Sequence, residues 1–121
     1  MTGVIRLSPI ERAAKSELES KGYAVMPMIP CFATRYKPVH LMAERNATEL
    51  LYLKLKEIVR PQTDIMAIRQ FCYNDAMLLR RLFPLNGGWI TLHLEIWIRD
   101  TTGRFTCFEV LAEEIREVSH V

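Results

Sequence analysis

Two lysines, Lys54 and Lys56, are the most distinctive chemical feature of the sequence. They belong to the segment 49–58, in which leucines alternate with larger or charged residues, the period-2 pattern of a strand with one buried face. Residues two apart on a strand share a face, so that the two ammonium groups are expected about 7 Å apart on the same side. Neighbouring ammonium groups repel a metal cation, and the pair therefore indicates a site for an anion.

More basic residues surround this strand in the sequence. The stretch 35–60 also contains Arg35, Lys37, His40, Arg45 and Arg60, against three glutamates. Tyr36 and Tyr52 are interleaved with these charges and could stack on bases or sugars. One interpretation is a groove that follows a nucleic-acid backbone, with contacts from Arg35, Lys37, Tyr52, Lys54 and Lys56. The other is that the lysines solvate the open face of a small sheet. Few phosphate contacts are needed for weak binding, and both interpretations stay open.

Carboxylates offer a different chemistry. Glu44 falls on the same strand face as His40, Glu49 opens the next strand, and Glu11 lies in the first predicted helix. If these side chains converged they could hold Mg²⁺, an ion that takes oxygen ligands. Nothing in the spacing requires them to meet. The simpler interpretation is that Glu11 completes a helix cap and the other two solvate strand ends. No metal ligand is therefore assigned, and no cofactor is expected unless this Mg²⁺ site forms.

The composition is that of an ordinary globular protein. The 121 residues suffice for one domain, expected over 1–121 with an ordered core at about 8–111. The net charge, 16 minus 14, is only +2, so a nucleic-acid site must come from local clustering. Cys31, Cys72 and Cys107 have no close spacing and indicate free thiols in a reducing cytoplasm. No stretch approaches the roughly 20 apolar residues of a membrane span, and no membrane partner is expected.

The pattern of residues predicts a helix, three strands, a helix and two strands. Ser8-Pro9-Ile10-Glu11 is a helix start with a capping box, and Gly22 ends that helix. Strands are predicted at 23–28, 38–44 and 49–58. Thr63 or Asp64 caps a second helix that ends near Phe83. A hairpin follows, with strands at 91–99 and 105–111, and the tail 112–118 is either a short helix or a further strand.

The hairpin also suggests self-association. Trp97 lies on the strand face opposite the leucines and isoleucines, which would expose aromatic surface if no helix covered it. We expect a homodimer through this hairpin or through the second helix.

This order of elements resembles the core of the restriction-endonuclease-like fold, which includes the PD-(D/E)XK nucleases and the archaeal Holliday-junction resolvases. The segment 20–25 is similar to the end of the family's first helix and the start of its first strand. Residues 38–43 look like the strand that carries a proline, an aspartate and an apolar run, and residues 52–56 look like the strand with the Glu-x-Lys pair. The resemblance covers about 8–111. It implies an α/β fold with a mixed central sheet flanked by helices.

The functional positions depart from the family's pattern. In the family, an acidic pair holds Mg²⁺ and a lysine helps to activate water. Here His40 stands at the aspartate position, Lys54 stands at the second carboxylate position, and only Lys56 matches the motif. The resemblance therefore implies a nuclease-fold protein with a degenerate catalytic site that binds DNA or RNA. Two alternatives stay open: a metal-dependent endonuclease that uses Glu11, Glu44 or Glu49, and a homo-oligomeric interaction protein with no nucleic-acid role.

Overall fold

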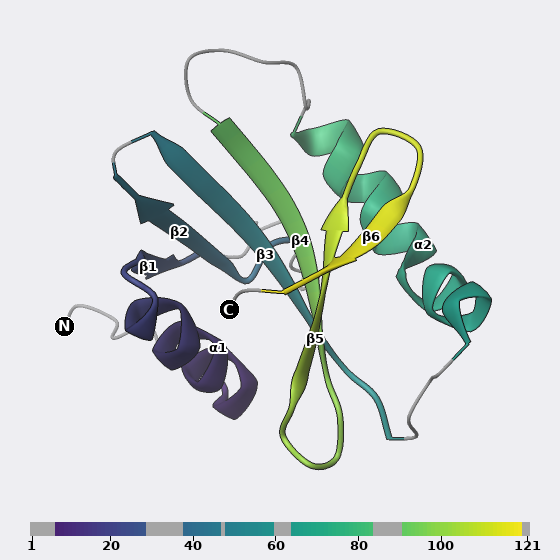
Figure 1. The fold of residues 1–121 in the computed structure, drawn as a ribbon, viewed down its shortest axis with the longest axis horizontal. Helices are drawn as coiled ribbons and strands as arrows, with labels where there is room; N and C mark the ends of the chain where they lie inside the picture. The colour runs from purple at the N-terminus through teal and green to yellow at the C-terminus, as the bar shows by residue number, and fades with distance from the viewer. Residues whose placement is uncertain (1–6, 29–37, 47, 60–63, 84–90, 120–121) are drawn as a thin grey trace, which may run out of the picture.

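The computed structural model describes residues 7–28, 38–46, 48–59, 64–83 and 91–119 of the chain. Within these ranges, a six-stranded sheet has its strands in the order of the sequence. The elements are α1 (Pro9–Ser20), β1 (Ala24–Pro27), β2 (Leu41–Arg45), β3 (Glu49–Glu57), α2 (Ile65–Leu82), β4 (Thr91–Arg99), β5 (Phe105–Val110) and β6 (Ile115–Val118). The α/β architecture and the element order predicted from the sequence are confirmed (Figure 1). Of the two structures predicted for the tail 112–118, the strand is the one observed, as β6.

One parallel pair divides the sheet. β3 and β4 run parallel, from Glu49 beside Thr91 to Glu57 beside Arg99, whereas every other neighbouring pair is antiparallel. Parallel neighbours need a long crossover between them, and α2 supplies it. The sheet is therefore mixed, and α2 lies between its two longest strands in the sequence.

The predicted helix signals are present in the structure. The Ser8 hydroxyl accepts a hydrogen bond from the backbone N–H of Glu11 at 3.3 Å, and the Glu11 carboxylate accepts one from the backbone N–H of Ser8 at 2.9 Å. This reciprocal capping box fixes the start of α1. Gly22 follows the helix at φ 91°, in the left-handed region that glycine tolerates. Asp64 caps α2, where its carboxylate accepts from the Met66 N–H at 3.1 Å.

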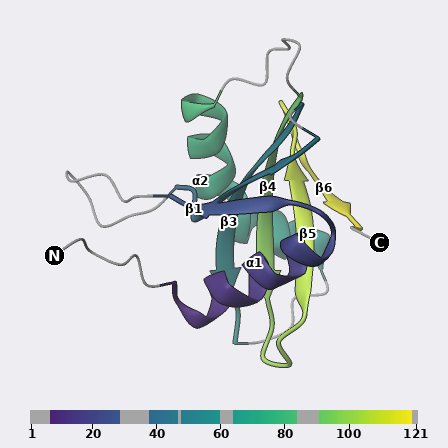
Figure 2. The ribbon, with the colours of Figure 1, turned by 90° about the vertical axis from the view of Figure 1, so that its left-hand side faces the viewer.

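Each face of the sheet has a hydrophobic core under one helix (Figures 1 and 2). The core under α1 contains Leu41, Leu51, Leu53, Leu55 and Trp97 with Ala14 and Leu18 of the helix. The core under α2 contains Leu94, Ile96, Ile98, Phe108 and Val110 with Cys72, Ala76 and Leu79 of the helix. Side chains alternate between the faces of a strand, and β3 and β4 therefore supply residues to both cores.

The sequence left open whether a helix covers the hairpin face that carries Trp97, and in the structure α1 covers it. Trp97 is 0% exposed, since α1 covers the face that the sequence pattern left open. Its indole N–H donates to Glu95 at 2.9 Å. Trp97 thus belongs to the core under α1.

Two described cysteines are free thiols buried in these cores. Cys72 of α2 faces the core under that helix, and Cys107 of β5 faces the core under α1. Burial disfavours the charged thiolate. It raises the pKa of Cys72 to about 11 and that of Cys107 to about 12.

The free energy of unfolding should decrease as the pH rises above about 9. Each folded-state pKa lies above the ordinary value of 9.0, so the unfolded chain loses these protons first. The stability is fully present below that pH and is lost as the pH rises toward the folded-state pKa, by about 1.4 kcal/mol per pH unit for one thiol. Urea unfolding of the wild-type chain and of a Cys107→Ala variant across this range measures the effect. The variant should lose stability less steeply; equal slopes would contradict the assignment, because all other groups titrate in both proteins.

Candidate functional site

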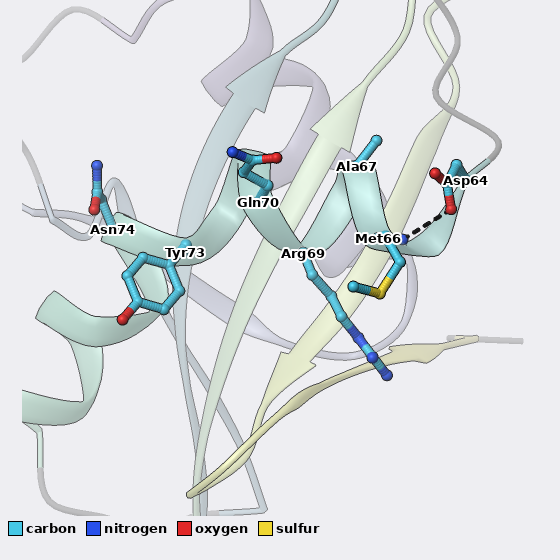
Figure 3. A pocket seen from close by; sticks show the side chains of 7 residues that line it. All are labelled: Asp64, Met66, Ala67, Arg69, Gln70, Tyr73 and Asn74. Carbon is cyan, nitrogen blue, oxygen red and sulfur yellow. Dashed lines mark hydrogen bonds between the residues drawn. The ribbon is translucent and has the colours of Figure 1, made fainter.

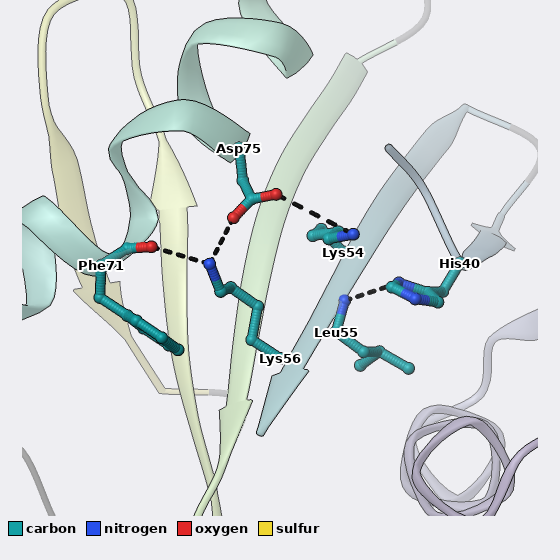
Figure 4. A network of polar contacts seen from close by, with 6 residues as sticks. All are labelled: His40, Lys54, Leu55, Lys56, Phe71 and Asp75. Atoms are coloured by element: carbon teal, nitrogen blue, oxygen red, sulfur yellow. Dashed lines mark hydrogen bonds and ion pairs between the residues drawn. The ribbon is translucent and has the colours of Figure 1, made fainter. Parts of the chain in front are cut away.

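The two motif lysines lie between β3 and α2, and an aspartate of α2 lies between them (Figure 4). The Lys56 ammonium is 2.5 Å from one carboxylate oxygen of Asp75, and the Lys54 ammonium is 3.9 Å from the other. These three residues are called the lysine–aspartate cluster below. Asp75 occupies the position on the inner face of α2 from which a side chain reaches the sheet, and its single carboxylate serves both ammonium groups.

The cluster is largely shielded from water. Lys54 is 7% exposed and Asp75 is 6% exposed. Burial lowers the pKa of Lys54, which the Asp75 carboxylate counteracts and the neighbouring Lys56 charge reinforces. Two cations and one anion leave the cluster with one net positive charge when all three groups are ionised.

Lys56 has two further partners on α2. Its ammonium donates to the backbone carbonyl oxygen of Phe71 at 2.7 Å and lies 4.0 Å from the centre of the Phe71 ring. The carbonyl, the ring and the Asp75 carboxylate all come from the same helix. Lys56 therefore binds α2 to β3 at three points, and these contacts define its orientation.

His40 has a structural contact at the motif position where the family has an aspartate. The backbone N–H of Leu55 donates to Nδ1 of His40 at 2.9 Å, and the backbone N–H of His40 donates to the Leu53 carbonyl oxygen at 2.8 Å. The imidazole thereby accepts the hydrogen bond that a backbone carbonyl would otherwise accept from Leu55, next to the first paired residues of β2 and β3. Nδ1 carries a lone pair in this arrangement, and the ring links these two strands.

The structure does not bring the three candidate carboxylates together. Glu11 is buried in the capping box of α1. Glu49 pairs with Arg45 at 2.9 Å on the face of the sheet that α1 covers. Glu44 is exposed and points to the opposite face, because it alternates with the buried Ala43. Among the residues that the structure describes, no group of three histidine, cysteine or acidic side chains could hold a metal ion.

The remaining residues predicted to contact nucleic acid are Tyr52, Arg35 and Lys37, and the structure describes only the first of them. The Tyr52 ring packs edge-on against Phe83 at the end of α2, with 4.6 Å between ring centres. Tyr52 is half-buried there and belongs to the edge of the core under α2. Arg35 and Lys37 lie outside the described residues.

Asp75 is the residue of the cluster that the sequence did not predict. It lies three residues after Cys72 and four before Leu79, and therefore on the apolar stripe that the helical period assigns to the core. A carboxylate is rarely buried unless it is paired. An acidic residue on such a stripe, together with two lysines on one face of a strand, is the sequence signal for a buried ion pair.

The chain has the restriction-endonuclease-like fold. A solved structure of Hjc, a Holliday junction resolvase from the archaeal hyperthermophile Archaeoglobus fulgidus, matches 92% of this chain and 86% of its own, with a TM-score of 0.53 and 14% sequence identity. The chain matches no protein-family profile, and no curated protein matches its sequence. No helix in the described part of the chain is long and apolar enough to cross a membrane.

Replacing Asp75 by asparagine should destabilise the fold much more than replacing Lys54 by methionine. Asp75→Asn leaves two neighbouring cations under α2 without their counter-charge, which costs about 3–5 kcal/mol for a buried pair and somewhat less here because Lys56 is partly exposed. Lys54→Met keeps the volume and the pair between Lys56 and Asp75, with an expected change of about 1 kcal/mol or less. Urea unfolding at neutral pH measures both. Similar losses for the two variants would show that Asp75 does not hold the cluster together.

Proposed function

We propose that this protein is a nuclease-fold protein that has lost metal-dependent phosphodiester cleavage and binds the backbone of DNA or RNA. The observation that carries the first part is the lysine–aspartate cluster, which occupies the strand position where the resemblance places the metal-binding carboxylate. Lys54 brings an ammonium group to that position and Lys56 brings a second one close by.

This arrangement opposes the binding of a divalent cation. Mg²⁺ takes oxygen ligands and retains several waters, and the carboxylate in the cluster is already shared between two ammonium groups. A metal ion would have to displace a buried charge-assisted contact and remain beside two like charges. Geometry disfavours the displaced-carboxylate alternative, because Glu11, Glu44 and Glu49 would have to come from two faces of the sheet. We therefore propose no resident Mg²⁺ and no other cofactor.

Two features support nucleic-acid binding. The fold is similar to that of a protein described as a Holliday junction resolvase, and the stretch 35–60 has a local excess of basic residues. The positive charge of the cluster would attract phosphate through its field. Lys54 is too deeply buried to touch a phosphate in this arrangement, whereas Lys56 is 19% exposed. We assign the direct contacts to Arg35, Lys37 and the exposed edge of Lys56.

A double variant, Arg35→Glu with Lys37→Glu, should weaken binding to every duplex, single strand and four-way junction, of DNA or RNA. Each lost phosphate contact reduces the slope of log affinity against log salt by about 0.9 on duplex DNA, so that the slope should become shallower by about two. Fluorescence anisotropy of labelled oligonucleotides at several salt concentrations measures both quantities.

The matched control is Lys15→Glu in α1 with Lys21→Glu at the C-cap of that helix, which changes the net charge by the same amount outside the stretch 35–60. Equal losses in the two double variants would indicate a general charge effect rather than this site. No salt-sensitive binding by the wild-type chain would refute the binding proposal. Nicking of the same substrates with Mg²⁺ or Mn²⁺ that disappears in Glu44→Gln would refute the loss of cleavage.

Self-association is a second proposed property, and the exposed apolar side chains of α2 favour it. Eight large hydrophobic residues in the described part of the chain are exposed, and six of these belong to α2: Ile65, Met66, Phe71, Tyr73, Met77 and Leu82. We propose a homodimer through α2, since α1 covers the relevant face of the hairpin.

The free thiols of Cys72 and Cys107 fit a reducing cytoplasm, which we propose as the location.

A further inference from the structure

A cavity of about 120 Å³ lies at the edge of the core under α1, where three strands meet the link between α1 and β1. A cavity of this size holds several water molecules, since one water needs about 10–15 Å³, and it therefore admits the edge of a flat ring. The name edge cavity is used below for this space, whose lining includes Tyr23, Arg45, Glu49, Leu51, His93 and Glu95.

A hollow on the outer side of α2 is different in kind. The side chains of Met66, Gln70 and Tyr73 at this hollow project away from the sheet (Figure 3). They belong to the helix through which we propose self-association. The edge cavity lies on the α1 side of the sheet, whereas α2 covers the opposite side, so a dimer through α2 would leave it open.

Three of the side chains that line the edge cavity are flat and are held by neighbours. The Arg45 guanidinium lies 4.6 Å from the centre of the Tyr23 ring. Nδ1 of His93 lies 2.8 Å from one carboxylate oxygen of Glu109, and Arg116 donates to the other oxygen at 3.0 Å. Flat groups that are fixed in this way are the surfaces on which unpaired bases stack.

The lining also offers hydrogen-bond donors and acceptors side by side. Nε of Arg45 donates to one carboxylate oxygen of Glu49 at 2.9 Å, and the two side chains are 39% and 37% exposed. A guanidinium has five N–H donors and a carboxylate about four acceptor positions, so this pair retains groups of both kinds for a ligand. Glu95 adds a second carboxylate, one oxygen of which accepts from the Trp97 indole N–H.

The two carboxylates determine which part of a nucleic acid can enter. A phosphate in the edge cavity would be repelled by Glu49 and Glu95. A base carries no charge, and its amino groups donate hydrogen bonds that carboxylates accept. The lining therefore suits a base and leaves the phosphates to the basic residues assigned above.

We infer that the edge cavity binds one unpaired guanine base of a single-stranded nucleic acid. This inference rests on the proposed nucleic-acid binding and names the part of the ligand that is recognised. The Watson–Crick edge of guanine has one acceptor, O6, followed by two donors, the N1–H and the N2 amino group. The pair of Arg45 and Glu49 presents the complementary order, an N–H donor beside the two oxygens of a carboxylate. Glu49 is therefore assigned to the two donors of guanine and Arg45 to O6.

The other bases fit this pair less well. Adenine and cytosine each have one amino donor beside a ring nitrogen that only accepts, and a carboxylate repels the lone pair of that nitrogen. Uracil and thymine have a single donor between two carbonyl oxygens. Guanine offers two neighbouring donors to one carboxylate, so a preference for guanine is the property that distinguishes this site.

Fluorescence anisotropy of labelled single strands tests this preference. A thymidine tract in DNA and a uridine tract in RNA each carry one central guanine, adenine, cytosine or hypoxanthine; hypoxanthine lacks only the N2 amino group of guanine. The guanine strand should bind roughly tenfold more tightly than each of the others, as expected for one good paired contact to a base. Equal binding of all strands would overturn the guanine site and leave the proposed function in place.

Two substitutions that remove the same charge separate the edge cavity from the general field of the protein. Glu49→Gln replaces one acceptor oxygen by a donor and should reduce the guanine strand to the affinity of the others. The matched control is Glu113→Gln, at an exposed position in the turn between β5 and β6 and outside the lining, which should keep the preference. Survival of the preference in Glu49→Gln, or its loss in the control, would overturn the assignment of Glu49.

Guanosine tests the edge cavity without any phosphate contact. The indole N–H of Trp97 reports on the cavity, because it donates to Glu95 of the lining. Its nuclear magnetic resonance signal should shift with millimolar guanosine and less with inosine, and the shift should be lost in a His93→Ala variant whose circular dichroism matches the wild type. No shift, or equal shifts with both nucleosides, would overturn the inference. A guanosine shift in a protein that binds no oligonucleotide would refute the proposed function and retain the guanine site.

Discussion

The attachment of α2 to the sheet depends on one carboxylate that serves two ammonium groups. Asp75 reaches from the helix to Lys54 and Lys56 on β3, the strand that pairs in parallel with β4. The crossover helix must lie on the sheet for these strands to be neighbours, and the ion pair defines where it does so. Three charges are largely removed from water at this point, which is tolerable only because each has an oppositely charged neighbour. The apolar core under α2 then packs around a contact that is specific in position.

The same interaction is the basis of the chemistry that we propose for this fold. A metal-dependent nuclease needs acidic oxygens directed at a divalent ion. In the family that the sequence resembles, one of these acidic residues lies on the strand where this chain has two lysines. The Asp75 carboxylate pairs with both lysine ammonium groups, and Nδ1 of His40 accepts a hydrogen bond from the backbone N–H of Leu55. The residues at the motif positions thus have structural partners in this protein.

Local signals in the sequence predicted most of the fold. The capping box at Ser8 and Glu11, Gly22 at the end of α1 and the alternation in β3 are effects of neighbouring residues, and each appears as expected. The environment of Trp97 and of Lys54 could not be obtained in this way. Alternation shows that two side chains share a face, but only the packing of α1 and α2 decides whether that face is covered. Asp75 was missed for a related reason: its role requires α2 to pack on β3 so that it meets Lys56, which lies 19 residues earlier in the sequence.

The central claim is that the lysine–aspartate cluster occupies the metal position as a stable ion-paired unit. Nuclear magnetic resonance of the lysine side-chain ammonium groups during a titration with Mn²⁺ tests it directly, since the paramagnetic ion broadens any group near its binding site. The account predicts that the Lys56 ammonium signal is slow to exchange with water, disappears or shifts in Asp75→Asn, and shows no selective broadening by Mn²⁺. Selective broadening of Lys56 at substoichiometric Mn²⁺ would place a metal ion in the cluster and would contradict the account.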